Sequence, residues 1–282
     1  MITFPNAKIN IGLQVTERRP DGYHNLDTVF YPIPINDALE VIVAEKADYD
    51  CRLHISGINI EGDTDNNLVV RAYRLLAADY TLPSVDIHLH KHIPTGAGLG
   101  GGSADASYML CLLNDMFKLG ITADRLEAYA TQLGADCPFF INNTPVYATG
   151  IGNEFHSIDL DLSGWYIVVV KPDVFVSTKE AYSMVKPEKP AITLDKKITR
   201  PITEWKESIS NDFEKGIFAL HPELANIKEK LYTLGAKYAA MSGSGSALFG
   251  LFETPIENIE QYFPSCFCEQ QKLPDSHRGA SK

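Results

Sequence analysis

A glycine-rich segment at residues 94–105 constrains this chain more than any other feature. It reads Pro-Thr-Gly-Ala-Gly-Leu-Gly-Gly-Gly-Ser-Ala-Asp, with five glycines in seven positions, and it lies between an alternating strand pattern and an amphipathic helix pattern. Glycine adopts positive φ without strain and lets a ligand approach the backbone. The start of a helix adds free N–H groups and about half a positive charge. The segment therefore predicts a loop that binds the phosphate of a nucleotide.

Two familiar phosphate-binding loops fit this segment poorly. Gly96, Gly98 and Gly101 have the spacing of the dinucleotide fingerprint. That fingerprint requires a strand after the helix and an acidic residue about 20 positions on, whereas here a second helix pattern follows. A P-loop ends in Gly-Lys-Ser/Thr, and the segment contains no lysine. Neither a Rossmann domain nor a P-loop protein is favoured.

Length and charge indicate a two-domain protein that binds a small molecule. The 282 residues, 45% of them hydrophobic, exceed the roughly 100–200 of a typical domain. The longest apolar run, residues 165–170, falls short of the ~20 residues of a membrane span, and polar residues at positions 6, 8 and 10 argue against a secretory signal. A cytoplasmic protein is expected. A net charge of −11 without a basic tract predicts no nucleic-acid partner, and no membrane or obligate protein partner is inferred.

Cysteine and histidine spacing predicts neither a disulfide framework nor a protein-held metal. The five cysteines form no Cys-x-x-Cys pair, the spacing that zinc sites commonly show. His88, His90 and His92 alternate along a predicted strand and so share one face. Because apolar residues occupy the other face, the histidines are predicted to lie on the polar side. Magnesium carried by a nucleotide is the only metal expected.

Hydrophobic periodicity predicts an α+β architecture with a domain boundary near residue 155. The Asn211–Glu214 stretch has the spacing of a capping box at the start of a helix, and Lys186–Lys197 reads as a solvated loop. Strands are predicted at 9–15, 39–43, 85–89 and 165–171, and helices at 68–75, 103–117, 126–133, 211–220 and 223–234. Ser103 is the candidate N-cap of the helix that follows the glycine segment.

Three segments in order along the chain resemble the GHMP kinases, a family of small-molecule kinases. They are the glycine segment, Pro5–Asn10 near the N-terminus, and the Ser-Gly-Ser-Gly-Ser stretch at Ser242–Ser246. The resemblance implies a two-domain GHMP kinase fold, with an N-terminal sheet-and-helix domain over 1–155 and a C-terminal ferredoxin-like α/β layer domain over 156–282. It implies ATP as the nucleotide, bound by Pro94, Thr95, Gly96, Ala97, Gly98, Leu99, Gly100, Gly101, Gly102, Ser103 and Ala104.

Three further stretches are similar to one branch of that family. They are Thr16–Leu26, with its Arg-Pro-Asp-Gly-Tyr-His run, Gly134–Phe140 and Asn211–Glu214. The branch implies phosphorylation of a hydroxyl, the 2-hydroxyl, of 4-diphosphocytidyl-2-C-methyl-D-erythritol, a step of the non-mevalonate route to isoprenoid precursors. A mevalonate- or homoserine-type kinase of the same family, and a non-catalytic ATP-binding sensor on the same fold, remain as alternatives.

The resemblance assigns the chemistry to Lys8 and Asp136. Phosphoryl transfer to an alcohol needs positioning and stabilisation of charge on the phosphoryl oxygens. Asp136 would accept the hydroxyl proton as the general base, and Lys8 would supply positive charge. Each residue also has a purely structural interpretation, because Asp136 could cap a helix and Lys8 could lie on the surface of a strand.

The resemblance also implies the residues that bind the acceptor. Tyr23 would stack on the cytosine, His24 would read its edge, and Asn10 would orient the erythritol end. A second aromatic on the base corresponds by position to Tyr182, with Thr178 nearby, although an aromatic packed in an ordinary helix would explain Tyr182 equally.

Overall fold

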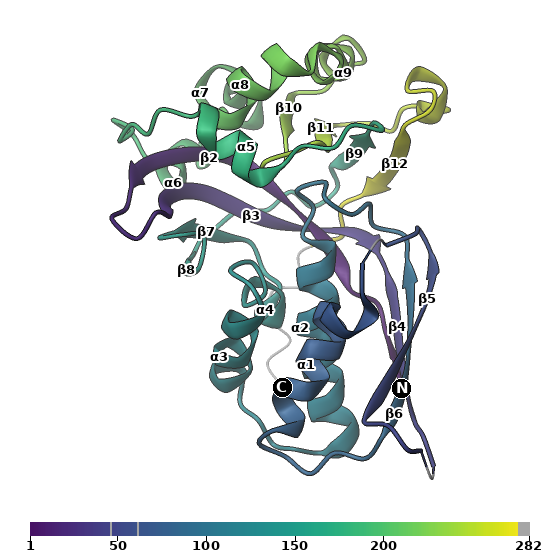
Figure 1. Ribbon diagram of the computed structural model, residues 1–282. Coiled ribbons are helices and arrows are strands. Elements are labelled where there is room, and N and C mark those ends of the chain that lie inside the picture. The colour runs from purple at the N-terminus through teal and green to yellow at the C-terminus, as the bar shows by residue number, and fades with distance from the viewer. Residues whose placement is uncertain (46, 61, 276–282) are drawn as a thin grey trace. The chain divides into compact units, whose positions relative to one another are not determined.

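The computed structural model describes residues 1–45, 47–60 and 62–275 (Figure 1). Contacts divide the chain into two units that alternate along the sequence. Unit 1 comprises Met1–Lys8, Ile35–Thr95 and Gly100–Thr144, and unit 2 comprises Ile9–Pro34, Gly96–Leu99 and Pro145–Lys282. The sequence-based domain boundary at residue 155 stays a prediction.

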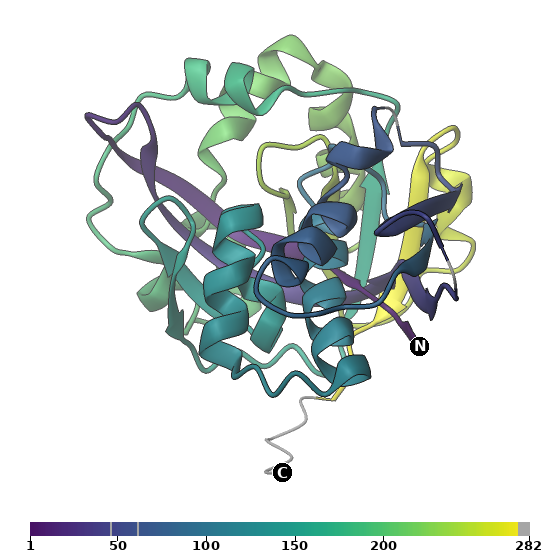
Figure 2. The same cartoon turned by 60° about the horizontal axis from the view of Figure 1, so that its bottom comes forward.

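Unit 1 is a four-stranded sheet in the order β1-β4-β6-β5, covered by helices. Along β6 the side chains alternate, so that Val85, Ile87 and Leu89 are buried while His88 and His90 are exposed. The buried side packs against α1 and α2, which lie side by side (Figures 1 and 2). The elements are β1 (Ile2–Thr3), β4 (Ala38–Val43), β5 (Cys51–Gly57), η1 (Thr64–Asn66), α1 (Leu68–Ala77), β6 (Val85–Lys91), α2 (Gly101–Phe117), α3 (Ala123–Leu133) and α4 (Phe139–Asn142).

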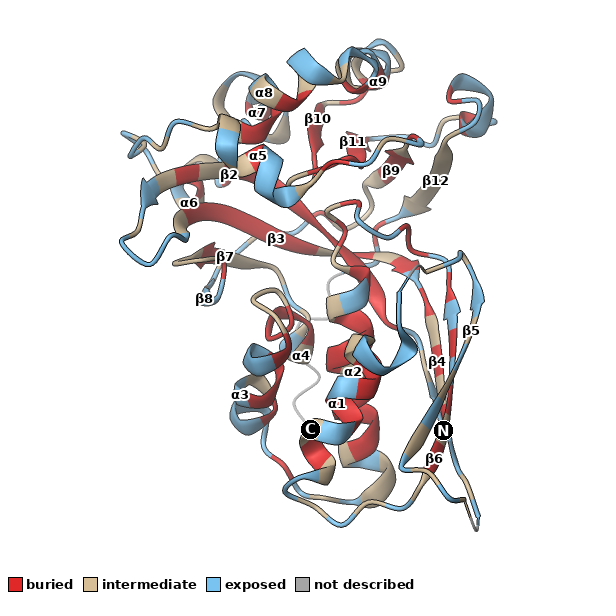
Figure 3. Cartoon of the chain, viewed as in Figure 1, coloured by how far each residue is buried: buried red, intermediate tan, exposed pale blue. Residues whose placement is uncertain are grey.

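Unit 2 contains two four-stranded sheets. One has the order β2-β3-β7-β8, and β2 and β3 are buried along most of their length (Figure 3). Its strands are β2 (Asn6–Arg18), whose first three residues belong to unit 1, β3 (His24–Asn36), β7 (Val146–Thr149) and β8 (Glu154–Ser157).

The second sheet of unit 2 is antiparallel in the order β10-β11-β9-β12. Helices separate β9 from the β10–β11 hairpin, and β12 returns beside β9, which is the ferredoxin-like arrangement; a short 3₁₀ helix replaces the second crossover helix. The elements are β9 (Tyr166–Lys171), α5 (Thr178–Met184), α6 (Leu194–Lys197), η2 (Ile202–Glu204), α7 (Trp205–Ser208), α8 (Asp212–Leu220), α9 (Pro222–Thr233), β10 (Tyr238–Met241), β11 (Leu248–Phe252), η3 (Ile259–Tyr262) and β12 (Phe267–Lys272).

The α+β architecture is confirmed, and three local expectations need correction. Helix α2 begins at Gly101 rather than at Ser103, because Gly100 adopts the left-handed conformation and ends the loop there. The last four residues of the predicted loop Lys186–Lys197 form α6. The capping box at α8 is half present: Asn211 Oδ1 accepts from the Phe213 N–H, but the Glu214 carboxylate binds elsewhere. Across the described ranges, no helix has both the length and the hydropathy that crossing a bilayer requires.

Candidate active site

Lys8 and Asp136 form an ion pair in unit 1. Lys8 lies on β2 with 3% of its surface exposed, and its Nζ is 3.3 Å from Asp136 Oδ2. The Asp136 side chain keeps 35% of its surface exposed. The structural interpretations of the two residues do not hold, because Lys8 is not on the surface and the N-cap of the nearby helix α4 is Pro138. A buried ammonium therefore faces a carboxylate that is open to solvent.

Local packing holds this pair beside the start of α2. Gly100, the N-cap of α2, has φ +72°, and a Cβ on it would lie 3.1 Å from Lys8 Cγ and 2.9 Å from Phe140 Cζ. Ser107 Oγ, on α2, lies 2.6 Å from the Cys137 carbonyl oxygen and can donate to it. The stem of Lys8 and the turn that carries Asp136 are thus both fixed against the first turns of α2, whose free N–H groups favour an anion.

The middle of the glycine loop is held within unit 2 by the Ser242–Ser246 segment. Ser242 Oγ donates to the Gly98 carbonyl oxygen at 2.8 Å, and the Ala247 N–H donates to Ala97 O at 3.1 Å. Gly98 has φ +76°, and a Cβ there would lie 2.0 Å from Ser242 O. Only glycine fits at position 98, because both the backbone conformation and the space exclude a side chain.

The Asn211–Glu214 stretch supports that same segment. Asn211 Nδ2 donates to the carbonyl oxygens of Met241 and Gly243, each at 2.8 Å. Glu214 Oε1 accepts from the Met241 N–H at 2.8 Å, and its Oε2 pairs with Lys228 Nζ at 2.6 Å. The stretch is thus a support for the glycine-rich turn, and the capping interpretation accounts for only one of its contacts.

The predicted ATP contacts divide between loop and helix. Residues 94–100 form the loop, and residues 101–104 form the first turn of α2. Ala97 and Leu99 have buried side chains, so only their backbone atoms are available to a ligand. Ser103 is the third residue of α2, and Gly100 takes the N-cap position that the sequence suggested for Ser103.

Gly102, the second residue of α2, has open space beside its backbone. A Cβ on Gly102 would meet only Leu68 Cδ1, at 3.8 Å, which is ordinary contact. Nothing in the described fold therefore demands glycine there. A ligand lying against the backbone gives a reason for it.

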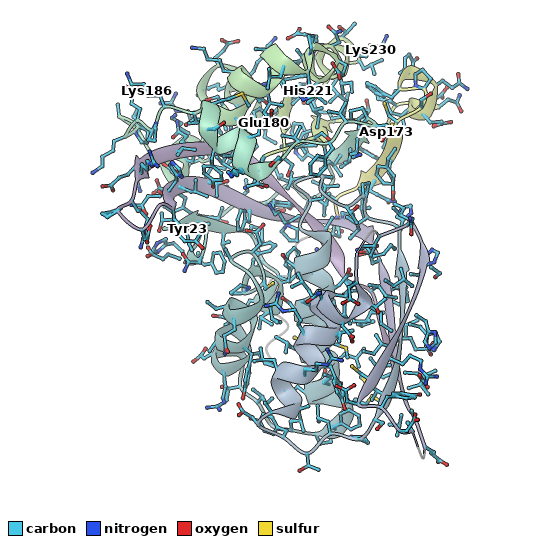
Figure 4. All side chains as sticks on the ribbon, in the orientation of Figure 1. Tyr23, Asp173, Glu180, Lys186, His221 and Lys230 are labelled. Atoms are coloured by element: carbon cyan, nitrogen blue, oxygen red, sulfur yellow. The ribbon has the colours of Figure 1, made fainter. Side chains whose placement is uncertain are left out.

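Two of the five predicted acceptor-binding residues, His24 and Tyr182, lie in one aromatic cluster of unit 2. The ring of His24 stacks on Tyr182, with centroids 4.8 Å apart, and Tyr182 also meets Phe213 edge-on at 4.9 Å. Tyr23, at the β2–β3 hairpin, is 61% exposed (Figure 4). Partial burial and the charge of Arg18 lower the pKa of His24. The lowered pKa favours the neutral imidazole, and the ring stacked on Tyr182 belongs to the protein itself, which sequence reasoning did not foresee.

Asn10 and Thr178 both contact the Ser242–Ser246 segment. The Asn10 N–H donates to Ser242 Oγ at 3.2 Å, and its Nδ2 donates to Thr28 Oγ1 at 2.9 Å. Thr178 Oγ1 lies 3.1 Å from Ser244 Oγ. Sequence reasoning missed Thr28, which fixes the Asn10 amide, and Phe213, which supports Tyr182. Phe213 was within reach, because it stands inside the stretch that had been interpreted as a helix cap.

The histidines of β6 lie on the exposed face, as expected. His88 stacks on His54 with centroids 4.7 Å apart, and His90 Nδ1 lies 3.0 Å from Ser56 Oγ. In the described part of the chain, no three histidine, cysteine or acidic side chains are arranged to hold a metal.

Comparison with known proteins gives consistent matches over the chain. Residues 67–143 match the GHMP kinases N terminal domain, and residues 196–269 match the GHMP kinases C terminal domain. A Bacteroides fragilis protein named 4-diphosphocytidyl-2-C-methyl-D-erythritol kinase is 56% identical over 97% of this chain and 100% of its own length. A protein of the same name from Parabacteroides distasonis is 53% identical over the same shares.

Solved structures agree with these relatives. A crystal structure of 4-(cytidine 5'-diphospho)-2C-methyl-D-erythritol kinase matches with a TM-score of 0.81 and 32% identity, covering 96% of this chain and 99% of the other. The mevalonate kinase of Methanococcus jannaschii matches with a TM-score of 0.70 over 98% of each chain, but at 14% identity that similarity shows the fold alone.

Proposed function

Because this chain belongs to the GHMP kinase family, we propose that it transfers the γ-phosphoryl group of ATP to the 2-hydroxyl of 4-diphosphocytidyl-2-C-methyl-D-erythritol, in the non-mevalonate route to isoprenoid precursors. The observation that carries the proposed chemistry is the Lys8–Asp136 pair, 3.3 Å apart beside the start of α2. The choice of acceptor is supported by relatives of that name that are 53–56% identical over nearly the whole chain.

In this proposal Asp136 is the general base. Its side chain is 35% exposed, so a hydroxyl can approach the carboxylate. Acceptance of the hydroxyl proton during bond formation contributes typically ~10²- to 10⁴-fold to a rate. Asp136 thereby makes the acceptor oxygen a better nucleophile toward phosphorus.

Lys8 supplies the fixed positive charge. At 3.3 Å and an effective dielectric constant of ~20, two unit charges interact by about 5 kcal/mol. An ammonium held in place by packing needs no reorganisation when charge develops on the phosphoryl oxygens. Lys8 therefore both orients Asp136 and stabilises the transition state.

The loop 94–104 holds the phosphates of ATP in this proposal. Gly96, Gly98 and Gly100 have positive φ, Gly102 leaves its backbone open, and the first turn of an α-helix such as α2 has N–H groups without an intrahelical partner. Mg²⁺ usually keeps several waters and binds through substrate phosphates with few protein carboxylates. We therefore place it with the nucleotide, where it would neutralise phosphate charge.

The cytidyl part of the acceptor is assigned to Tyr23, His24 and Tyr182, and the polar end to Asn10 and Thr178. A flat base is held well by aromatic faces and by hydrogen bonds to its edge. The neutral imidazole of His24 offers one donor and one acceptor for such an edge.

The test is turnover of purified protein with ATP and a panel of alcohols. Formation of ADP with the cytidine diphosphate substrate, and not with mevalonate or homoserine, is expected. ADP release with mevalonate or homoserine alone would assign another kinase of the family, and ATP binding with no turnover on any alcohol would indicate a sensor.

A second arm of the test separates the acceptor from the nucleotide. Tyr23→Ala should raise the KM for the cytidyl acceptor at least fivefold and change that for ATP less than twofold, because stacking on a base contributes about 1–3 kcal/mol. Tyr262→Ala is a matched control, since Tyr262 is also exposed and lies on the short helix η3. Equal losses for both ligands would contradict stacking by Tyr23.

A further inference from the structure

Three charged side chains of unit 1, none of them used in the proposed chemistry, are buried together. Lys91, at the end of β6, is 1% exposed, and Asp37, between β3 and β4, and Asp105, on α2, are also buried. Lys91 Nζ donates to Asp37 Oδ2 and, at 2.7 Å, to Asp105 Oδ2. Charged groups are rarely buried unless paired, so this cluster calls for an explanation.

The cluster meets the phosphate loop on both sides. Asp37 Oδ1 accepts from the N–H groups of His92, at 2.6 Å, and Ile93, at 2.8 Å, the two residues that lead into the loop. Asp105 is the fifth residue of α2, the helix that follows the loop. A Cβ on Gly101 would lie 3.4 Å from Lys91 Nζ, so the ammonium lies against the first residue of α2.

Lys91 is unavailable as a phosphate ligand. Lys91 is almost fully buried, and within the described ranges its Nζ forms ion pairs with the carboxylates of Asp37 and Asp105. The ammonium joins Asp37, and through it the backbone before the loop, to Asp105, on the helix after the loop. Asp105 Oδ1 is buried without a hydrogen-bond partner among the described residues, which carries a desolvation cost. A cluster with such a cost is poor evidence for stability alone.

We propose that Asp37 is a positioning residue for nucleotide binding: by accepting the His92 and Ile93 N–H groups, and held by Lys91 and Asp105, it fixes the entry of the phosphate loop relative to α2. The inference rests on the proposed function only in that residues 94–104 bind ATP. Asp37 acts through the loop, and none of the three side chains is proposed to touch the nucleotide. Removing the Asp37 carboxylate should therefore weaken the binding of ATP and leave the binding of the cytidyl substrate unaffected.

The test compares two double variants that both lack the ion pair. Asp37→Asn with Lys91→Met keeps a side-chain oxygen that can accept the His92 and Ile93 N–H groups. Asp37→Ala with Lys91→Met does not. ATP binding is measured by calorimetry without any acceptor, at a temperature where thermal melting shows that the protein is folded. The alanine variant should bind ATP at least tenfold more weakly than wild type, and the asparagine variant within threefold of it.

Asp27→Ala is the matched control. Asp27 is an equally buried carboxylate of unit 2 that accepts a backbone N–H, from Leu194. Its loss should lower the melting temperature and change ATP affinity less than twofold. The inference is overturned if the two double variants bind ATP equally well, or if Asp27→Ala weakens ATP binding as much as the Asp37→Ala, Lys91→Met double variant does. In turnover, the alanine variant should raise the KM for ATP without raising that for the acceptor.

Wild-type hydrogen exchange keeps the inference testable if the variants do not fold. The His92 and Ile93 amides should exchange only with global unfolding. Exchange of these amides through local opening would overturn the positioning role of Asp37. The measurements also separate this inference from the proposed function. If wild type binds ATP tightly and the Asp37→Ala, Lys91→Met variant loses affinity as expected, but the cytidyl substrate is not turned over, the positioning role of Asp37 stands and the proposed acceptor is wrong. A wild type that binds no ATP would overturn both the positioning role and the proposed function.

Discussion

Replacing Asp136 by asparagine separates catalysis from stability at the proposed site. The side chain keeps its size but loses its charge and its ability to take a proton. If Asp136 is the general base, turnover should fall by at least a hundredfold, because proton acceptance contributes ~10²- to 10⁴-fold. ATP affinity should stay within threefold of wild type, since the phosphate loop is untouched.

The same change should also destabilise the protein. The gross attraction between Lys8 and Asp136 at 3.3 Å is about 5 kcal/mol at an effective dielectric constant of ~20. Water screens part of it, because a third of the Asp136 side chain is exposed, so we expect a loss of about 2–3 kcal/mol in the free energy of unfolding. The loss arises because the buried Lys8 ammonium loses the attraction of the Asp136 charge beside it.

A double variant distinguishes the two effects. Lys8→Met combined with Asp136→Asn removes both charges, so it should recover most of the lost stability while turnover stays at least a hundredfold down. Urea unfolding and steady-state turnover are measured on the same samples. Glu253→Gln is the control, because the Lys237–Glu253 pair has the same 3.3 Å separation but is exposed; it should change stability by less than about 0.5 kcal/mol and turnover not at all. If turnover returns with stability in the double variant, Asp136 acts only as a structural partner of Lys8.

Two further predictions concern the loop and the buried cluster. Gly98→Ala should abolish measurable ATP binding and lower the melting temperature, because its Cβ would lie 2.0 Å from Ser242 O; Gly102→Ala, measured beside it, should keep the wild-type melting temperature, and equal melting of both variants would contradict the steric argument. Burial raises the pKa of Asp105 to about 7, above the ~3.9 of an exposed aspartate, so between about pH 4 and 7 the folded protein binds more protons than the unfolded chain. This contribution to stability is present below about pH 4 and is lost as the pH rises through 7; Asp105→Asn should remove that slope in urea unfolding at pH 5 to 8, and an unchanged slope would refute the assignment.

Sequence patterns were sufficient for much of the fold. The two-domain GHMP kinase fold, with sheets and helices in both parts, is confirmed, and the alternation of residues 85–89 correctly predicted which face of β6 is buried. Strand β2 was harder, because its alternating polar residues Asn6, Lys8 and Asn10 are themselves buried, so no exposed face marks its length. The start of α2 was placed late, because capping rules look for a polar side chain and here the cap is a left-handed glycine.

Long-range contacts were the part that local patterns could not supply. The spacing of Asn211 and Glu214 indicated a capping box, but the Glu214 carboxylate instead binds the Met241 N–H, far along the chain. The pairing of Lys8 with Asp136 follows from motif resemblance and from no local periodicity. Lys91 did leave a signal: it continues the buried register of Val85, Ile87 and Leu89, where a lysine is out of place unless a carboxylate meets it.

The stacking of His24 on Tyr182 has a consequence for inhibitors aimed at the proposed acceptor site. Any flat compound that replaces the imidazole gains its own contact with the tyrosine but forfeits an existing one, which for aromatic pairs is about 0.5–1.5 kcal/mol. Ring size alone is therefore a poor guide to potency there, and a chemist would gain more by engaging the freed His24 nitrogens than by enlarging the ring.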